Sequence, residues 1–83
     1  MAELIKIIGS EVALSTASNV GQAVAVRLYN NTAGAVVVTR AAAGGATIGT
    51  VTMGSGEIMY MQKQSTDTLA AASAIRAAAV AIN

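Results

Sequence analysis

Apolar and polar side chains alternate with a period of two along much of this chain, which is the pattern of strands with one buried face. The clearest stretch runs over residues 23–40, where alternating apolar positions are followed by a polar loop at 30–34 and then by a run of valines. A loop of this length predicts a β-hairpin, and one register of that hairpin makes a whole face apolar. In that register the buried face consists of Val26 opposite Val38 and Leu28 opposite Val36.

Further period-two runs predict strands on both sides of this hairpin, separated by turns that are rich in Gly, Ser and Asn. The expected strands lie at 3–8, 12–14, 46–53 and 57–63, and the expected loops and turns lie at 15–21, 41–45 and 54–56. Within 46–53, Gly49 marks a bulge or a close approach of another backbone. One face of 57–63 is rich in methionine, which suits an irregular core or an adaptable contact surface.

The C-terminal third of the chain allows two interpretations. Apolar residues fall at helical spacing at Leu69, Ala72, Ile75, Ala79 and Ile82. Asp67 could cap a helix that begins at Thr68, and alanine is the best helix former, so propensity alone favours a helix. Against this, the alternating residues at 78–82 fit a strand. The residues by themselves leave helix and strand open for 68–83.

Length and composition predict one small domain that spans residues 1–83. The chain is 54% apolar, but much of that fraction is alanine and both Phe and Trp are absent, so the expected core is thin. Chains of this size often need disulfides, metals or partners for stability. Cys and His are both absent, which excludes disulfides and the usual transition-metal sites. Contacts with partner proteins are therefore the expected source of additional stability.

Charge is sparse, with five basic residues, four acidic residues and a net charge of +1. This charge is too small to hold a phosphate backbone, so Tyr29 and Tyr60 are expected to be half-buried strand residues rather than platforms for nucleic-acid bases. Residues 69–82 are mostly apolar but too few to cross a bilayer. Glu3 lies where a signal peptide would carry positive charge. We therefore expect a protein made in the cytoplasm, with no nucleic-acid or membrane partner.

No arrangement of residues predicts an active site. Without His or Cys there is no conventional catalytic triad. The four acids are Glu3, Glu11, Glu57 and Asp67. Their spacing matches neither a paired-carboxylate site nor a calcium loop. The stretches at 44–50 and 54–56 lack the lysine or the third glycine of nucleotide-binding loops and are interpreted as turns. We therefore expect no enzyme, and no catalytic, cofactor-binding or metal-binding residue.

Lys63 and Asp67 form the best local pair of charges. In a turn that follows a strand, the Asp67 carboxylate can accept hydrogen bonds from backbone amides and approach the Lys63 ammonium. We interpret this pair as a structural corner rather than as a contact with a partner.

Four segments in a fixed order carry a resemblance to a known group of proteins. They are R-L-Y-N-N-T-A-G at 27–34, I-G-T-V-T-M at 48–53, G-E-I-M-Y-M-Q-K-Q-S-T-D-T-L-A-A at 56–71 and a closing A-I-R-A-A-A-V-A-I at 74–82. Through these segments the chain resembles small virion proteins of marine and cyanobacterial tailed phages. The most specific piece is the corner that contains Lys63, Asp67 and Leu69.

The turns that separate the period-two runs predict an all-β, antiparallel fold of about seven to eight short strands. The resemblance implies that this fold is a small β-sandwich or barrel, in which 77–82 is a strand rather than part of a helix. It also implies a non-enzymatic structural protein of the virion, which decorates or cements the capsid. The implied partners are the major capsid protein or other virion subunits, and the implied state within the assembly is a homo-oligomer without cofactors. A tail or neck component is the alternative, and a small ligand-binding β module is a third possibility.

Overall fold

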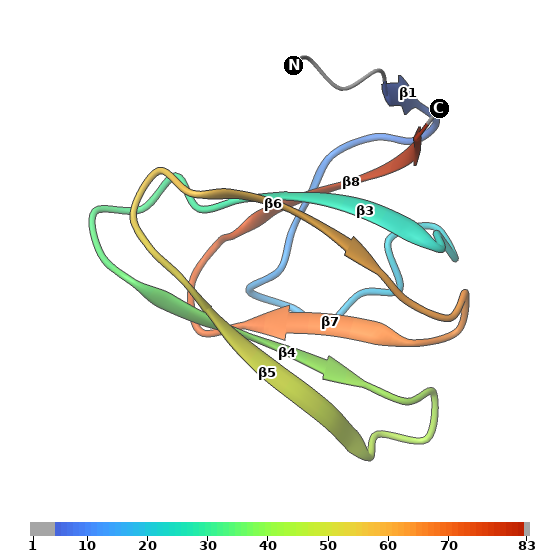
Figure 1. Cartoon of the computed structure of the whole chain (residues 1–83). Helices are drawn as coiled ribbons and strands as arrows, with labels where there is room; N and C mark the ends of the chain where they lie inside the picture. Colours follow the sequence, from blue (N-terminus) through green and yellow to red (C-terminus); the bar gives the residue numbers. More distant parts are fainter. Residues whose placement is uncertain (1–4, 83) are drawn as a thin grey trace.

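The computed structural model describes residues 5–82, and these residues form eight strands and no helix (Figure 1). In chain order the strands are β1 (Ile5–Ile7), β2 (Val12–Ala13), β3 (Ala25–Tyr29), β4 (Val36–Ala41), β5 (Thr47–Met53), β6 (Ile58–Gln62), β7 (Thr68–Ala71) and β8 (Arg76–Ile82). The predicted all-β fold is confirmed, including a strand at the C-terminus. The strand expected at 3–8 is present at 5–7, and residues 3 and 4 lie outside the described residues. Within that range no helix is long and apolar enough to cross a membrane.

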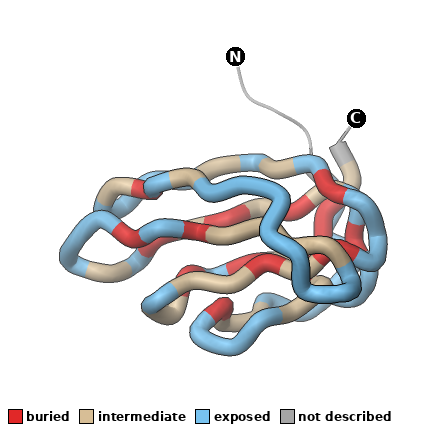
Figure 2. The backbone as a smooth tube through the Cα atoms, turned by 90° about the horizontal axis from the view of Figure 1, so that it is seen from below, coloured by how far each residue is buried: buried red, intermediate tan, exposed pale blue. Residues whose placement is uncertain are grey.

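The strands form two antiparallel sheets that lie face to face as a sandwich (Figure 1). One sheet has the order β1–β8–β3–β6, with β2 also paired to β8, and the other has the order β5–β4–β7. Buried residues line the space between the two layers, while the loops are largely exposed (Figure 2). The residues of the core that are 0% exposed include Leu14, Val26, Leu28, Val38, Met53, Leu69 and Ile75.

Strand pairing, rather than helix propensity, determines the conformation of the alanine-rich C-terminus. β8 pairs with β3 along one edge and with β1 and β2 along the other. Ala77 and Ala79 belong to the buried core, where their small side chains let the two sheets pack closely. A helix over these residues would leave the backbone of β3 without a partner on that edge, and this cost outweighs the helix propensity of alanine.

The hairpin predicted for residues 23–40 is wrong. β3 pairs with β6 and β8, whereas β4 pairs with β5 and β7, so the two strands belong to different sheets. The connection between them crosses from one layer to the other (Figure 1). The residues predicted to be buried are nevertheless buried, but they face one another across the sandwich instead of lying side by side. They are Val26, Leu28, Val36 and Val38.

The side chain of Asn30 explains why the chain crosses between layers here. Asn30 is 0% exposed, and its Nδ2 donates hydrogen bonds to the carbonyl oxygens of Gly34 (3.0 Å) and Met53 (2.9 Å). Its Oδ1 accepts hydrogen bonds from the backbone N–H (3.0 Å) and the hydroxyl (2.6 Å) of Thr32. Because Met53 ends β5 in the second sheet, these bonds fix the loop as a bridge between the two layers.

Two turns occur where the sequence predicts them. Residues 42–46 join β4 to β5, and Ala42 donates its backbone N–H to Ala46 O (2.8 Å), while Ala41 is the last residue of β4 rather than part of the turn. The turn at 54–56 joins β5 to β6, and Glu57 N–H donates to Gly54 O (3.0 Å). Since β5 and β6 belong to different sheets, this second turn holds the two strands together at one end of the sandwich.

Of the bulge or close backbone approach predicted at Gly49, a bulge is present beside that residue, at Ile48. The register between β4 and β5 passes from Arg40 opposite Gly49 to Ala41 opposite Thr47, and it skips Ile48. The ladder is therefore regular from residue 49 to residue 53 and irregular before it.

Residues 12–18 close one side of the sandwich. Val12 and Ala13 pair with β8, and Ser18 forms an isolated bridge with Leu69 of β7. Between these points Leu14 accepts a hydrogen bond from β7 and donates one to the segment that leads into β8. The strand predicted at 12–14 is thus present as β2, and the following loop covers edges of both sheets.

Three consecutive residues after this segment have a left-handed backbone, with φ of 53° at Val20, 66° at Gly21 and 59° at Gln22. This conformation is easy for glycine but strained for a β-branched valine. Two side chains hold it in place, because Ser18 Oγ accepts a hydrogen bond from Val20 N (3.0 Å) and Asn19 Oδ1 accepts one from Gln22 N (3.2 Å). Burial of Val20 compensates for the strain.

Candidate interaction surface

β5 and β6 are the outermost strands of their sheets on the side away from residues 12–18. In the part of the chain that the structure describes, β5 pairs with β4 alone and β6 pairs with β3 alone. Each strand therefore presents unpaired backbone N–H and C=O groups along its free edge. We call the surface formed by β5 and β6 the open side.

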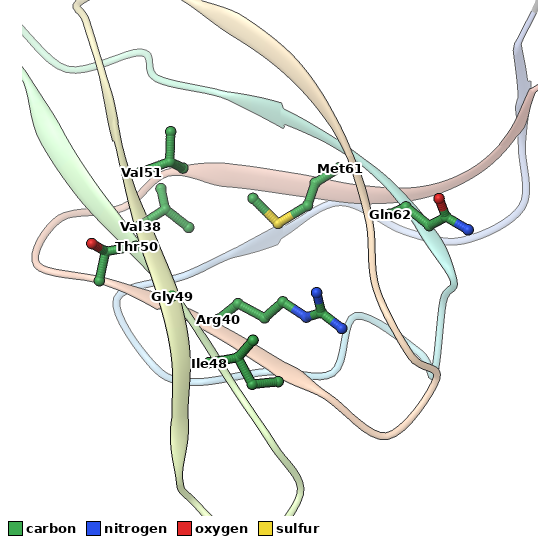
Figure 3. Close-up of a pocket in the computed structure, with 8 residues that line it drawn as sticks. All are labelled: Val38, Arg40, Ile48, Gly49, Thr50, Val51, Met61 and Gln62. Carbon is green, nitrogen blue, oxygen red and sulfur yellow. The ribbon is translucent and has the colours of Figure 1, made fainter.

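A cleft of about 210 Å³ lies between the two strands of the open side (Figure 3). Its base is the buried Val38 of β4, and its walls are Gly49 and Val51 of β5 and Met61 of β6. Figure 3 shows the Met61 side chain extending from β6 toward Val38 and Val51. The cleft is thus lined mainly by apolar groups that belong to the interior face of the sandwich.

The core is incompletely covered at this cleft. Gly49 lies opposite the inward-facing Arg40 but is exposed, and Val51, Met59 and Met61 pack against the core while remaining only half-buried. The central inward-facing residues of β3 and β4 are fully buried by comparison. Apolar surface that faces inward therefore still contacts water on the open side, and covering it would be favourable.

The two strands of the open side carry no charge themselves, although Arg40 of β4 lines the cleft between them. Residues 41–56, which include all of β5 and both flanking turns, contain no charged residue, and neither does β6. Ile48 and Ile58 on these strands are 51% and 48% exposed. Soluble proteins usually protect free edges with charged side chains or proline, and here the bulge at Ile48 is the protective feature of β5. The sequence indicated the bulge and the methionine-rich face, but strand order was needed to show that both lie on a free edge.

The corner predicted at Lys63 and Asp67 is present, but its ion pair has a different partner. Asp67 Oδ2 accepts a hydrogen bond from Gln64 N (3.2 Å), as expected for a turn. The same oxygen accepts hydrogen bonds from Arg40 Nε (2.9 Å) and Nη2 (2.6 Å). Lys63 Nζ instead donates to the carbonyl oxygens of Gln64 (3.2 Å) and Ser65 (3.4 Å). Arg40 was not predicted, because its position beside the corner depends on the pairing of β4 with β7.

The electrostatics of the corner follow from this geometry. The hydrogen bonds from Arg40 lower the pKa of Asp67 below its ordinary value, and Lys63 adds a smaller contribution in the same direction. Burial lowers the pKa of Lys63, while the charge of Asp67 opposes that change. Both side chains are almost fully buried and bonded within the chain, which supports a structural corner.

Two of the four acids, Asp67 and Glu57, are bonded to the backbone of turns. Asp67 accepts from Gln64, and Glu57 Oε1 accepts a hydrogen bond from Gly54 N (2.8 Å). Among residues 5–82 no group of three or more His, Cys, Asp or Glu residues could hold a metal ion.

The outer face of β3 and β6 carries both tyrosines. Arg27 lies opposite Tyr60, and Tyr29 lies opposite Ile58. The Arg27 guanidinium carbon is 5.8 Å from the centre of the Tyr29 ring, which is within the range of a cation–π interaction. Tyr29 is half-buried as predicted, whereas Tyr60 is 37% exposed.

Comparisons of the chain with protein-family models, with curated proteins and with solved structures found no match. The geometry of the open side and the sequence resemblance are therefore the two observations that bear on function.

Proposed function

We propose that this protein is a non-enzymatic structural component of a virion, which decorates or cements the capsid by binding the major capsid protein. The open side carries this proposal, because it combines two free, uncharged strand edges with an incompletely covered core. Edges of this kind bind other polypeptides by extending a sheet. The virion setting is suggested by the sequence resemblance over 27–34, 48–53, 56–71 and 74–82.

The energetics favour a partner on the open side. Full burial of an apolar side chain such as Val or Met contributes about 1.5–3 kcal/mol relative to exposure, so the half-buried Val51, Met59 and Met61 could each gain about 1 kcal/mol. A partner that binds the folded state also stabilises it by mass action. Both effects matter for a small domain whose core is rich in alanine.

A structural role is also consistent with the way the polar groups are used. Asp67 and Arg40 bond each other, Asn30 bonds its own loop and the end of β5, and Glu57 bonds a turn amide. Arg40 lines the cleft, but its guanidinium is bonded to Asp67, and no other acid or base among residues 5–82 lines the cleft. The cleft therefore lacks the group of acids and bases that an active site would present.

Co-sedimentation tests the proposal. Purified protein is mixed either with capsids that lack it or with purified tails, and the bound fraction is measured over a range of concentrations. Saturable binding to capsids, near a whole-number ratio to the major capsid subunit, is the expected result. Binding to tails alone would instead identify a tail or neck component, and binding to neither particle would contradict a virion role and leave the ligand-binding module.

A pair of variants tests whether the open side is used. Tyr60→Lys places a charge at an exposed position of the free strand β6, whereas Val37→Lys places the same charge at an exposed position of the central strand β4. Tyr60→Lys should weaken capsid binding, and Val37→Lys should leave it unchanged. Equal binding by the two variants would show that the capsid docks elsewhere on the molecule.

A further inference from the structure

β5 is the strand of the open side best suited to pair with an identical strand. It has seven residues against five in β6, and no charge occurs in β5 or in the turns on either side of it. The two paired edges bring no like charges of their own together, and Arg40 beside the cleft is already paired with Asp67. Pairing through identical surfaces is the usual way in which two copies of a chain form a closed dimer.

The bulge limits the register in which β5 can pair. Ile48 is skipped in the ladder with β4, so the regular part of the strand is residues 49–53. An antiparallel copy centred on this regular part would place Val51 opposite Val51 and Thr50 opposite Thr52. The valine pair would lie on the inner face, next to the cleft, and the two threonine pairs would lie on the exposed outer face. Such pairs of like residues are favourable cross-strand neighbours.

Gly49 is the second feature that points to a close neighbour. It is the one glycine inside a strand among residues 5–82, its φ lies outside the left-handed region, and a Cβ placed on it would meet no atom within 4 Å. The fold of a single chain therefore has no steric need for glycine here, although glycine weakens a strand. In the register centred on Val51, Gly49 lies opposite Met53 of the second copy, and the missing side chain lets that copy approach the cleft.

We propose that two copies of this protein pair through β5, antiparallel about a twofold axis at Val51, so that their three-stranded sheets become continuous. The pairing covers the free edge of β5 and part of the cleft, and it leaves β6 and the outer face of the other sheet for a different subunit. This inference rests on the proposed function only in taking the open side to be an interface.

Self-association of the purified protein, with no virion particle present, tests the pairing. Gly49→Glu places a charge on the inner face of the paired edge, and Gly44→Glu is the matched control, since Gly44 lies in an exposed turn with open space around it. By analytical ultracentrifugation the wild type and Gly44→Glu should form dimers, and Gly49→Glu should associate at least about tenfold more weakly. A wild type that stays monomeric at every concentration, or equal association of both variants, would overturn the proposal.

Disulfide trapping tests the register. The chain has no cysteine, so Thr50→Cys and Thr52→Cys each introduce a single thiol on the exposed outer face. In the proposed register Thr50 of one copy lies directly opposite Thr52 of the other, with about 5.5 Å or less between their Cα atoms. The two Thr50 residues, and likewise the two Thr52 residues, are offset by two positions, and their Cα atoms lie beyond the limit of about 7 Å for a disulfide. An equimolar mixture should therefore cross-link faster than either variant alone. The proposed register would be contradicted if one variant alone cross-linked as fast as the mixture. It would also be contradicted if neither the mixture nor the single variants cross-linked.

These measurements separate the two proposals. A trapped dimer that binds neither capsids nor tails would retain the pairing and contradict the virion role. A monomer that binds capsids would retain the virion role and contradict the pairing.

Discussion

Arg40 of β4 donates two hydrogen bonds to Asp67 Oδ2, across a sequence separation of 27 residues. This ion pair ties the turn that precedes β7 to the strand with which β7 pairs. Asp67 is 4% exposed, so the pair lies between the sheet and the corner rather than in free solution.

Acid should destabilise the protein through Asp67. The pKa of Asp67 is lowered in the folded state, so its contribution to stability is fully present above the ordinary aspartate value of about 3.9 and is lost as the pH falls through the lower, folded value. Urea denaturation at a series of pH values should show stability declining below about pH 4. In Asp67→Asn this decline should be shallower, and equal declines in the two proteins would show that Asp67 is not responsible.

Loss of the Asn30 side chain should be costly. Asn30→Ala removes four hydrogen bonds and takes the Asn30 donor away from the carbonyl oxygen of the buried Met53, while Gly34 O keeps its hydrogen bond from Thr32 Oγ1 (2.9 Å). We expect a loss of roughly 2–3 kcal/mol in the free energy of unfolding, measured by urea denaturation. Asn31→Ala is the control, since Asn31 is exposed, and it should change stability by less than about 0.5 kcal/mol. Similar losses in both variants would contradict the role assigned to Asn30.

A charge should abolish folding at one of two adjacent valines of β4 and leave the thermal stability nearly unchanged at the other. Val38 is 0% exposed and faces the core, whereas Val37 is 47% exposed on the outer face. Val38→Asp should abolish cooperative folding, because an unpaired buried charge costs several kcal/mol. Val37→Asp should melt close to the wild type. Wild-type-like thermal melting of Val38→Asp, followed by circular dichroism, would contradict the inward orientation of this residue.

The same substitution at two glycines should change stability in opposite directions. Gly21 has a φ of 66° and open space around it, so Gly21→Ala should cost about 1 kcal/mol through backbone strain alone. Gly49 has no left-handed φ and also has open space, so Gly49→Ala should stabilise the free chain by about 0.5–1 kcal/mol. Both are measured by denaturation at concentrations where the protein is monomeric. A destabilised Gly49→Ala would mean that the fold of the chain itself requires this glycine.

Strands and turns could be predicted from the sequence because their signals are local. Alternation around Val26 and Leu28, and glycines at 54–56, act through the nearest residues. The pairing of strands could not be predicted in the same way. The six-residue connection between β3 and β4 suits a hairpin as well as a crossing between layers. The bond that decides between them joins Asn30 to Met53, 23 residues away.

The candidate site was visible only in parts for the same reason. Gly49 and the methionines of β6 were notable in the sequence, but the open side depends on which strands end each sheet. The partner of Asp67 was misassigned because Lys63 is near in sequence, whereas Arg40 is near only in space. The C-terminal strand was ambiguous because its alanines favour a helix locally and a sheet only in contact with β3.

The segment at 12–18 also limits how far an assembly can grow. Within residues 5–82, β1 and β2 occupy the far edge of β8, and Ser18 bridges the far edge of β7. Among the strands that the structure describes, the free edges of β5 and β6 lie together on the open side, whereas the outer edge of β1 is free as well but is only three residues long. The open side is therefore the main surface on which another strand can pair. In a pair joined through β5, each subunit binds the other with the same strand. The contact is therefore closed, and no β5 edge is left for a third subunit. The fold thereby favours a finite pair over an endless fibre, despite an uncharged edge of the kind that otherwise promotes fibre growth.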